Sequence, residues 1–253
     1  MSINNQTLLT YLNQLLKPEK VKDYCPNGLQ VEGTSEIRKI ITGVTASQAL
    51  IDRAIELNAD AIFVHHGYFW RGENPCIVGM KRQRIKHLIN NEINLYAYHL
   101  PLDIHPELGN NAQLAKRLNI DVISGLEAQN QQSVAMLGQF ETPLTLQQLS
   151  NNIETSLQRT PQVISGGEHN IKSIAWCTGG GQSYIEMAAE QGVDAFISGE
   201  ISEQTVHVAR EMGIHFIAAG HHATERYGAK AVGEYLARSF DLEVIFEDID
   251  NPV

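Results

Sequence analysis

The sequence predicts an α/β protein whose mixed sheets are covered by helices. Short apolar runs alternate with amphipathic stretches of roughly 10 to 15 residues, which is typical of strands joined by crossover helices. A long segment recurs in the second half of the chain, and several predicted strands end in histidines and carboxylates. With 253 residues, of which 43% are hydrophobic, the chain can bury a substantial core in one large or two small domains.

The internal repeat gives the domain organisation. "ITGVTASQALIDRAIELNADAIFVHH" from Ile41 matches "AWCTGGGQSYIEMAAEQGVDAFISGE" from Ala175, with Asp60 on Asp194. "INLYAYHLPLD" then matches "HFIAAGHHATE", which pairs His99 with His221 and Asp103 with Glu225. We therefore expect an internal structural duplication, with a first α/β repeat at residues 1–126, a variable connecting segment at 127–170 and a second repeat at 171–253.

Periodicity assigns the remaining elements in chain order. "QTLLTYLNQLLK" carries a helical apolar stripe that Pro18 ends, and this helix should dock on the sheet. The connecting segment predicts a strand at 133–140, a helix at 145–157 and a turn at 165–170. "HHATERYGAKAVGEYLAR", residues 221–238, predicts a helix that places His221 and Glu225 on one face.

The stretch "AIFVHHGYFW", residues 61–70, runs from a buried strand into two adjacent histidines. Side chains alternate along a strand, so two imidazoles inside it would diverge. At the carboxyl end of the strand the backbone can turn and both rings can face one crevice, where open α/β sheets usually bind ligands. His65 and His66 are therefore candidate site residues.

Imidazoles and carboxylates, without thiolates, make up the whole set of polar strand-end residues: His65, His66, His99, Asp103, His221, His222 and Glu225. One such histidine is more often structural, but the full set favours a catalytic transition-metal site. The number of groups exceeds what one ion needs, which suggests two divalent ions bridged by Glu225 or Asp103. Iron, zinc, manganese and nickel all suit these ligands, and His99 is expected to contact a ligand or the substrate.

Other features restrict the function. The net charge of −10 argues against nucleic acid as a partner, and neither a membrane span nor a signal peptide is recognisable, which predicts a cytoplasmic protein. Cys25, Cys76 and Cys177 are expected to be buried free thiols. The "CTGGGQS" turn, residues 177–183, could hold a phosphate on its amides, although a plain strand-to-helix turn is the favoured interpretation.

The motifs "CPNGLQVEG", "DAIFVHHG", "HLPLD" and "GHHATE" resemble those of the Nif-three-like dinuclear metal proteins, the GTP cyclohydrolase 1 type 2 homologues. The resemblance implies two intertwined α/β domains, a homohexameric ring and a metal site formed between the repeats. It implies metal ligation by His65, His66, Asp103, His221 and Glu225. Where many relatives have an acidic residue followed by His, this chain has Glu200 and Gln204, so Glu200 is expected to contact a ligand or the substrate.

These observations predict a metal-dependent hydrolase of the cyclohydrolase type. A metal-activated water would attack a nucleotide or a related heterocycle, with His99 as the catalytic group that moves protons. Two alternatives remain open at this point. One is a non-catalytic metal-binding ring protein with a regulatory or partner-binding role, and the other is a phosphoesterase that uses the same site.

Overall fold

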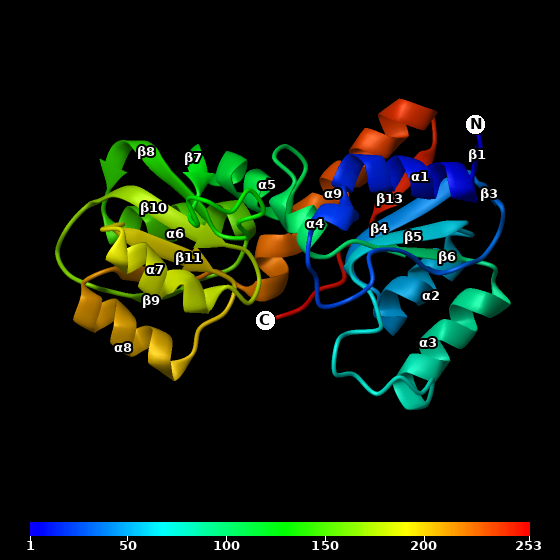
Figure 1. Cartoon of the computed structure of the whole chain (residues 1–253), viewed down its shortest axis with the longest axis horizontal. Helices are drawn as coiled ribbons and strands as arrows, with labels where there is room; N and C mark the ends of the chain where they lie inside the picture. The colour runs from blue at the N-terminus through cyan, green and yellow to red at the C-terminus, as the bar shows by residue number, and fades with distance from the viewer. The chain divides into compact units, whose positions relative to one another are not determined.

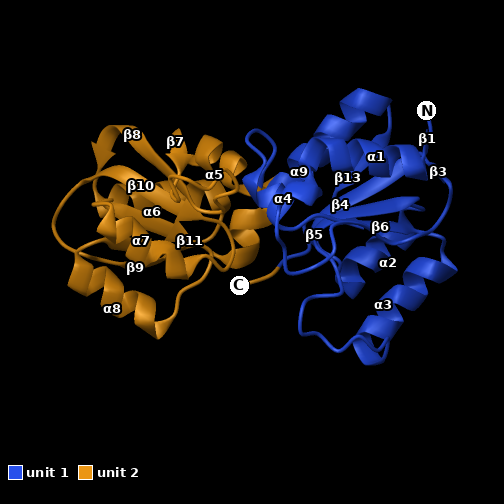
Figure 2. Cartoon of the chain, viewed as in Figure 1, with its two compact units in different colours: residues 1–109, 228–250 blue, residues 110–227, 251–253 orange.

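The computed structural model describes residues 1–253 and divides into two compact units (Figure 2). Unit 1 comprises residues 1–109 and 228–250, and unit 2 comprises residues 110–227 and 251–253. This division differs from the expected one, because residues 110–126 belong to unit 2 and residues 228–250 return to unit 1. The cause of the return is a strand near the C-terminus that pairs in parallel with the first long strand of unit 1.

Unit 1 is built on a five-stranded mixed sheet in the order β13-β4-β5-β6-β2, in which only β2 is antiparallel to its neighbour. Its elements are β1 (Ile3–Asn4), α1 (Asn5–Leu16), the 3-10 helix η1 (Pro18–Lys20), β2 (Gly28–Val31), β3 (Glu36–Ile37), β4 (Lys39–Thr45), α2 (Gln48–Glu56), β5 (Ala61–His66), α3 (Gly79–Asn90), β6 (Asn94–Ala97), α4 (Leu100–Ile104) and β13 (Glu243–Phe246), together with most of α9 (His221–Phe240).

Helices cover both faces of the unit 1 sheet (Figure 1). Because side chains alternate along each strand, Ile40 and Phe63 pack with α1 and α9, whereas Ile41 and Ile62 pack with α2 and α3. The α1 stripe is buried as predicted, and Lys17 ends the helix in the left-handed conformation just before Pro18. Both faces of β5 are therefore buried up to the histidine pair.

Unit 2 holds a six-stranded mixed sheet in the order β7-β8-β10-β11-β12-β9. Its elements are α5 (Asn110–Leu118), β7 (Asp121–Gly125), β8 (Met136–Leu144), α6 (Leu146–Leu157), β9 (Gln162–Ile164), β10 (Ile171–Cys177), the 3-10 helix η2 (Gln182–Tyr184), α7 (Ile185–Glu190), β11 (Ala195–Ser198), α8 (Glu203–Met212), β12 (His215–Ala218) and the first turns of α9. Helices α5 and α6 pack on one face, and α7 and α8 on the other (Figure 1). The predicted strand and helix of the connecting segment correspond to β8 and α6.

The same backbone hydrogen bonds recur in both units. The Asp60 carboxylate accepts from the amides of Arg38 and Lys39, and the Asp194 carboxylate accepts from the equivalent amides of Lys172 and Ser173. The central parallel strands β4-β5-β6 and β10-β11-β12 follow the same order. The two units therefore share one core topology.

The register of the third central strand corrects the sequence match by one residue. Ala61 pairs with Asn94, and its equivalent Ala195 pairs with His215, so Asn94 corresponds to His215. Because α4 and α9 begin equally far after these strands, His99 corresponds to Gly220 and not to His221. The sequence match had aligned identical residue types, whereas the hydrogen-bond ladder sets the true register.

Two further expectations concern composition. All three cysteines are free, but only Cys177 is buried; Cys76 is exposed on the segment before α3 and Cys25 is half-buried, which corrects the expectation that all three are buried. None of the helices combines the length and the apolar character that a membrane-spanning segment needs.

Candidate metal centre

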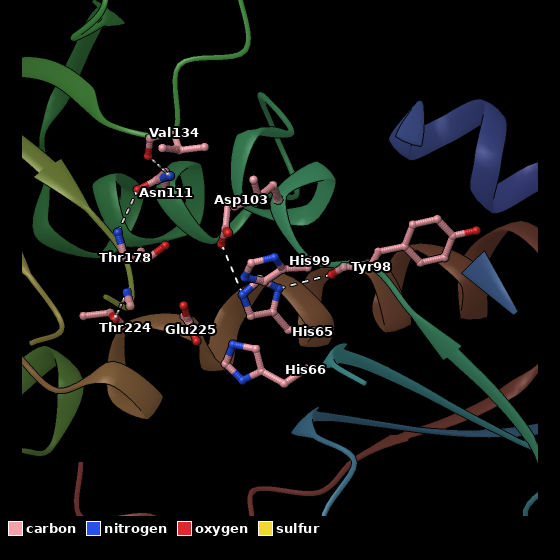
Figure 3. Close-up of polar contacts among 12 residues, drawn as sticks. His65, His66, Tyr98, His99, Asp103, Asn111, Val134, Thr178, Thr224 and Glu225 are labelled. Carbon is pink, nitrogen blue, oxygen red and sulfur yellow. Dashed lines mark hydrogen bonds and ion pairs between the residues drawn. The ribbon is translucent and has the colours of Figure 1, made fainter. Parts of the chain in front are cut away.

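His65 and His66 occupy the last two positions of β5, as predicted. The His65 side chain is fully buried, whereas His66 is half-buried. Their ring centroids are 4.4 Å apart, so the two rings gather at the end of the strand rather than diverging (Figure 3). His66 Nδ1 lies 3.1 Å from the hydroxyl of Thr45, the residue beside it on β4.

The hydrogen bonds of His65 define its tautomer. Nδ1 lies 3.2 Å from the backbone carbonyl oxygen of Tyr98, which can only accept, so Nδ1 carries the proton. In the neutral imidazole Nε2 then keeps its lone pair, and it lies 3.5 Å from Oδ1 of Asp103, a buried carboxylate on α4 (Figure 3). Histidines that bind metal usually donate the N–H of the other ring nitrogen to a carboxylate, a backbone carbonyl or water, and His65 has this arrangement.

His99 joins the histidine pair from the end of β6, where it precedes α4. Its ring centroid lies 5.0 Å from that of His65 and 5.8 Å from that of His66. One nitrogen from each of the three rings falls within 4.8 Å of the others, as a shared cation would require. The three predicted histidines of unit 1 therefore form one cluster (Figure 3).

Two residues that hold His99 were missed by the sequence analysis. His99 Nδ1 lies 2.7 Å from Oδ1 of Asp23, and the His99 amide donates to Oδ1 of Asn27. Asp23 also accepts from Leu100 N and from the Asn27 side chain. Burial opposes ionisation of Asp23, but hydrogen bonds led by that from His99 outweigh it and lower the pKa of its carboxyl. The neighbouring "CPNGLQVEG" motif, which contains Asn27, marked this loop only as a turn.

Unit 2 brings His221, Glu225 and Glu200 together. His221 Nδ1 lies 2.7 Å from Glu200 Oε1, and Nε2 lies 3.1 Å from Glu225 Oε2, one helical turn further along α9. Burial disfavours the charged imidazole, but the hydrogen bonds and charges of Glu225 and then Glu200 prevail and raise the pKa of His221 to about 9. This group of residues therefore favours a positive charge. His222, by contrast, donates its amide to the carbonyl of Val253.

The glycine turn after β10 lies against this pair. Gly179 has a φ of +64°, its amide donates to Thr224 Oγ1, and a Cβ at this position would collide with the Glu225 carboxylate and lie 3.1 Å from His221 Nε2. The Gly179 amide is thus committed to Thr224. This favours the interpretation of "CTGGGQS" as a turn, with the added role of making room for Glu225.

The chemistry of these groups fits divalent metal ions. Imidazole nitrogens and carboxylate oxygens suit zinc, iron, manganese and nickel, and they leave positions open to water. Cys25 lies within 4.8 Å of Asp23 and His99, but burial and then Asp23 raise the pKa of its thiol to about 12. In the metal-free protein Cys25 is therefore a neutral thiol near pH 7.

The fold and these clusters define an α/β protein with two mixed sheets flanked by helices and with buried histidine and carboxylate groups suited to metal binding. The sequence matches the family Duf34/NIF3 (NGG1p interacting factor 3) over residues 3–252, and the chain belongs to this family. It is 60% identical over 253 residues to a GTP cyclohydrolase 1 type 2 homolog of Vibrio cholerae, covering 99% of this chain and 100% of that protein. The corresponding Escherichia coli K12 protein is 54% identical over 251 residues, with the same coverage.

Solved structures show the same fold. A protein named ybgI, described as of unknown function, superimposes with a TM-score of 0.96 at 54% identity, over 99% of this chain and 100% of the other. TTHA1606 from Thermus thermophilus gives a TM-score of 0.89 at 32% identity, with the same coverage. These likenesses extend over the full length of both units.

Proposed function

We propose that this protein is a dinuclear metal-dependent hydrolase that acts on a nucleotide or a related heterocycle. Its ligands would be His65, His66 and Asp103 from unit 1, with His221 and Glu225 from unit 2, so that the centre lies between the repeats. The observation that carries the proposal is the buried His65, whose Nδ1–H is held by the Tyr98 carbonyl while Nε2 faces Asp103. Each unit alone offers few ligands for two ions, which supports a centre drawn from both.

When bound, two divalent ions would supply a water that ionises near neutral pH and would polarise an oxygen or nitrogen of the substrate. The chain's own residues would do the rest. His99, with its Nδ1 proton held by Asp23, would accept or donate a proton at Nε2. Glu200 would orient His221 through its Nδ1.

The relatives' shared name, GTP cyclohydrolase 1 type 2 homolog, supports a purine nucleotide as substrate. In such a reaction one water adds at C8 of the purine and opens the five-membered ring to a formamide, and a second water hydrolyses that formamide so that formate leaves. The protons that this requires would pass through His99. A phosphoesterase would use the same groups on a different bond.

A non-catalytic role is the second candidate, because the family description itself names an interacting factor. In that case the metals would stabilise a surface that binds a partner or regulates it. The His66→Ala variant separates the two roles, since a binding protein would lose its partner without any turnover to lose.

Three finer expectations remain part of the proposal. The recurrent carboxylate contacts of Asp60 and Asp194 support an internal duplication, and the return of residues 228–250 to unit 1 supports units that are intertwined along the chain. The family resemblance supports a homohexameric ring. A nucleotide substrate and the absence of a membrane-spanning helix are compatible with work in the cytoplasm.

The test is formate release from GTP by metal-loaded protein, beside Asp103→Asn. We expect formate in proportion to the GTP consumed, and a loss of at least about 100-fold in the variant. If metal-loaded protein hydrolyses neither a nucleotide nor a phosphoester with zinc, iron, manganese or nickel, the hydrolase proposal is wrong.

A further inference from the structure

The turn that follows the histidine pair holds a bulky residue in an uncommon backbone conformation. Seven non-glycine residues have positive φ, and six of them lie within two residues of a helix end, where the left-handed conformation is routine. The seventh is Phe69, with a φ of +67° and no helix end nearby. A bulky side chain in this region is strained, and such strain persists only where surrounding contacts impose it.

One set of contacts fixes the turn on its N-terminal side. The Gln30 amide accepts from Tyr68 N at 2.7 Å and donates to Tyr68 O at 3.1 Å. The Tyr68 hydroxyl donates to the carbonyl of Ala46. Gly67 allows these two Gln30 hydrogen bonds, because a Cβ at position 67 would collide with the Gln30 side chain. The backbone of Tyr68 is therefore fixed, and it cannot rotate to relieve the strained φ of Phe69.

A second set fixes the C-terminal side. Trp70 N donates to Glu73 Oε2, and Glu73 forms a 3.0 Å ion pair with Lys81. The Lys81 ammonium also lies 5.6 Å from the centroid of the Phe69 ring. Phe69 is thus held between Tyr68 and Trp70, whose backbone groups are both fixed by hydrogen bonds. The turn thereby sets the position of the Trp70 side chain.

Trp70 lies against the candidate centre. The centroid of its ring lies 4.8 Å from the centroid of the His99 ring, at an interplanar angle of 84°, and 5.9 Å from the centroid of the His66 ring. Unlike Trp176, which is fully buried in the core of unit 2, Trp70 is half-buried. The indole is therefore a large aromatic surface with access to solvent next to two of the site histidines.

The turn is also joined to the loop that orients His99. Arg71 N donates to the carbonyl of Tyr24, and the Arg71 guanidinium donates to the carbonyl of Asp23. Asp23 in turn accepts from His99 Nδ1. The turn that carries Trp70 and the His99 imidazole are therefore both held by the loop at Asp23 and Tyr24.

We propose that Trp70 is the surface on which the heteroaromatic ring of the substrate stacks, and that the strained turn at Phe69 serves to place it. This inference rests on the proposed function and narrows its substrate class to molecules with a planar heteroaromatic ring, such as nucleobases. Indole stacks on any base because every base has a π-face. A ring stacked here would lie next to His99 and the histidine pair.

The experiment measures nucleotide binding to metal-loaded, full-length protein by calorimetry and tryptophan fluorescence. The probes are GTP, ATP and inorganic tripolyphosphate, which has the phosphates without a base. The variants are Trp70→Leu and Trp70→Phe, with Tyr235→Leu as the control because Tyr235 is a half-buried aromatic that stacks on Tyr11 in the same unit. Metal content and molar mass by light scattering are recorded for each.

We expect GTP and ATP to bind more tightly than tripolyphosphate and to change the fluorescence of wild type but not of Trp70→Phe. Trp70→Leu should weaken nucleotide binding by about tenfold or more, whereas Trp70→Phe should weaken it by less than about threefold. Tripolyphosphate binding should be equal in all four proteins, and Tyr235→Leu should behave as wild type.

Equal nucleotide affinity in wild type and Trp70→Leu would overturn the inference, as would nucleotides that bind no better than tripolyphosphate. A changed molar mass in Trp70→Leu would assign Trp70 to contact between copies of the chain and would also overturn it. The proposed function fails differently, through absent metal or absent turnover. Full metal loading and turnover with no effect of Trp70→Leu would reject the stacking surface alone.

Discussion

Asp23 Oδ1 lies 2.7 Å from His99 Nδ1, although 76 positions separate the two residues in the sequence. The other oxygen of the same carboxylate accepts from Leu100 N and Asn27 Nδ2. Asp23 therefore fixes both the orientation of the imidazole and the nitrogen that carries its proton. In the neutral imidazole, His99 Nε2 then keeps its lone pair next to the histidine pair.

The Asp23→Asn variant should reverse the tautomer of His99. Oδ2 accepts from two donors, Leu100 N and the Asn27 side chain, so the amide oxygen would stay there at the expense of Tyr24 N, which donates to Oδ1 in the wild type. The amide NH₂ would then face His99 Nδ1 and force the proton to Nε2. Nitrogen-15 NMR of metal-free protein reports the tautomer directly. Turnover, where present, should fall by about 100-fold or more.

Asp52→Asn is the matched control for this variant, because Asp52 is an exposed carboxylate 3.9 Å from Nδ1 of His87. It should leave the His99 spectrum unchanged. An Nδ1–H tautomer that survives in Asp23→Asn would refute the positioning role of Asp23.

Gly179→Ala should disrupt the histidine and carboxylate pair of unit 2. The new Cβ would displace the Glu225 carboxylate in addition to the cost of a left-handed alanine, about 1–2 kcal/mol. Gly192→Ala separates the two effects, since Gly192 has a φ of +72° and a Cβ added there would meet no atom within 4 Å. Denaturant unfolding and metal content should show that both variants lose stability but that only Gly179→Ala loses metal. Equal metal loading in Gly179→Ala and Gly192→Ala would contradict the expected collision between a Cβ at position 179 and the Glu225 carboxylate.

Asp194 should contribute stability that is lost in acid. Burial raises its pKa, but the hydrogen bonds from Ser173 and Lys172 prevail and lower it below the usual value of 3.8. The contribution is therefore fully present above about pH 4 and disappears as the pH falls through the lower pKa of the folded state. Asp194→Asn should reduce the free energy of unfolding by about 1 kcal/mol near neutral pH, with a smaller difference in acid, at about pH 3. Exposed Asp121→Asn is the control, and a difference independent of pH would count against this interpretation.

Local patterns predicted much of the molecule. The stripe of α1, the strand that ends in His65 and His66, and the helix from His221 follow from periodicity and from stop residues such as Pro18. The clustering of His65, His66 and His99 followed because neighbouring parallel strands bring their ends to one edge of the sheet.

Contacts between distant segments were not predictable in this way. The bond from Asp23 to His99 depends on how a loop near the N-terminus folds over the end of β6, and composition marks that loop only as a turn. The return of residues 228–250 to unit 1 depends on the pairing of β13 with β4. The register of β12, which differs by one residue from the sequence match, is set by its backbone hydrogen bonds with β11. A comparison of residue types does not detect these bonds.

Metal content by elemental analysis of gently purified protein tests the central claim most directly. Wild type would be compared with His65→Ala in unit 1, Glu225→Ala in unit 2 and the exposed-histidine control His207→Ala. We predict about two divalent ions per chain in wild type and the control, and clear loss in each of the two ligand variants. Wild-type protein without metal, or full loading in either His65→Ala or Glu225→Ala, would contradict a dinuclear centre built from both units.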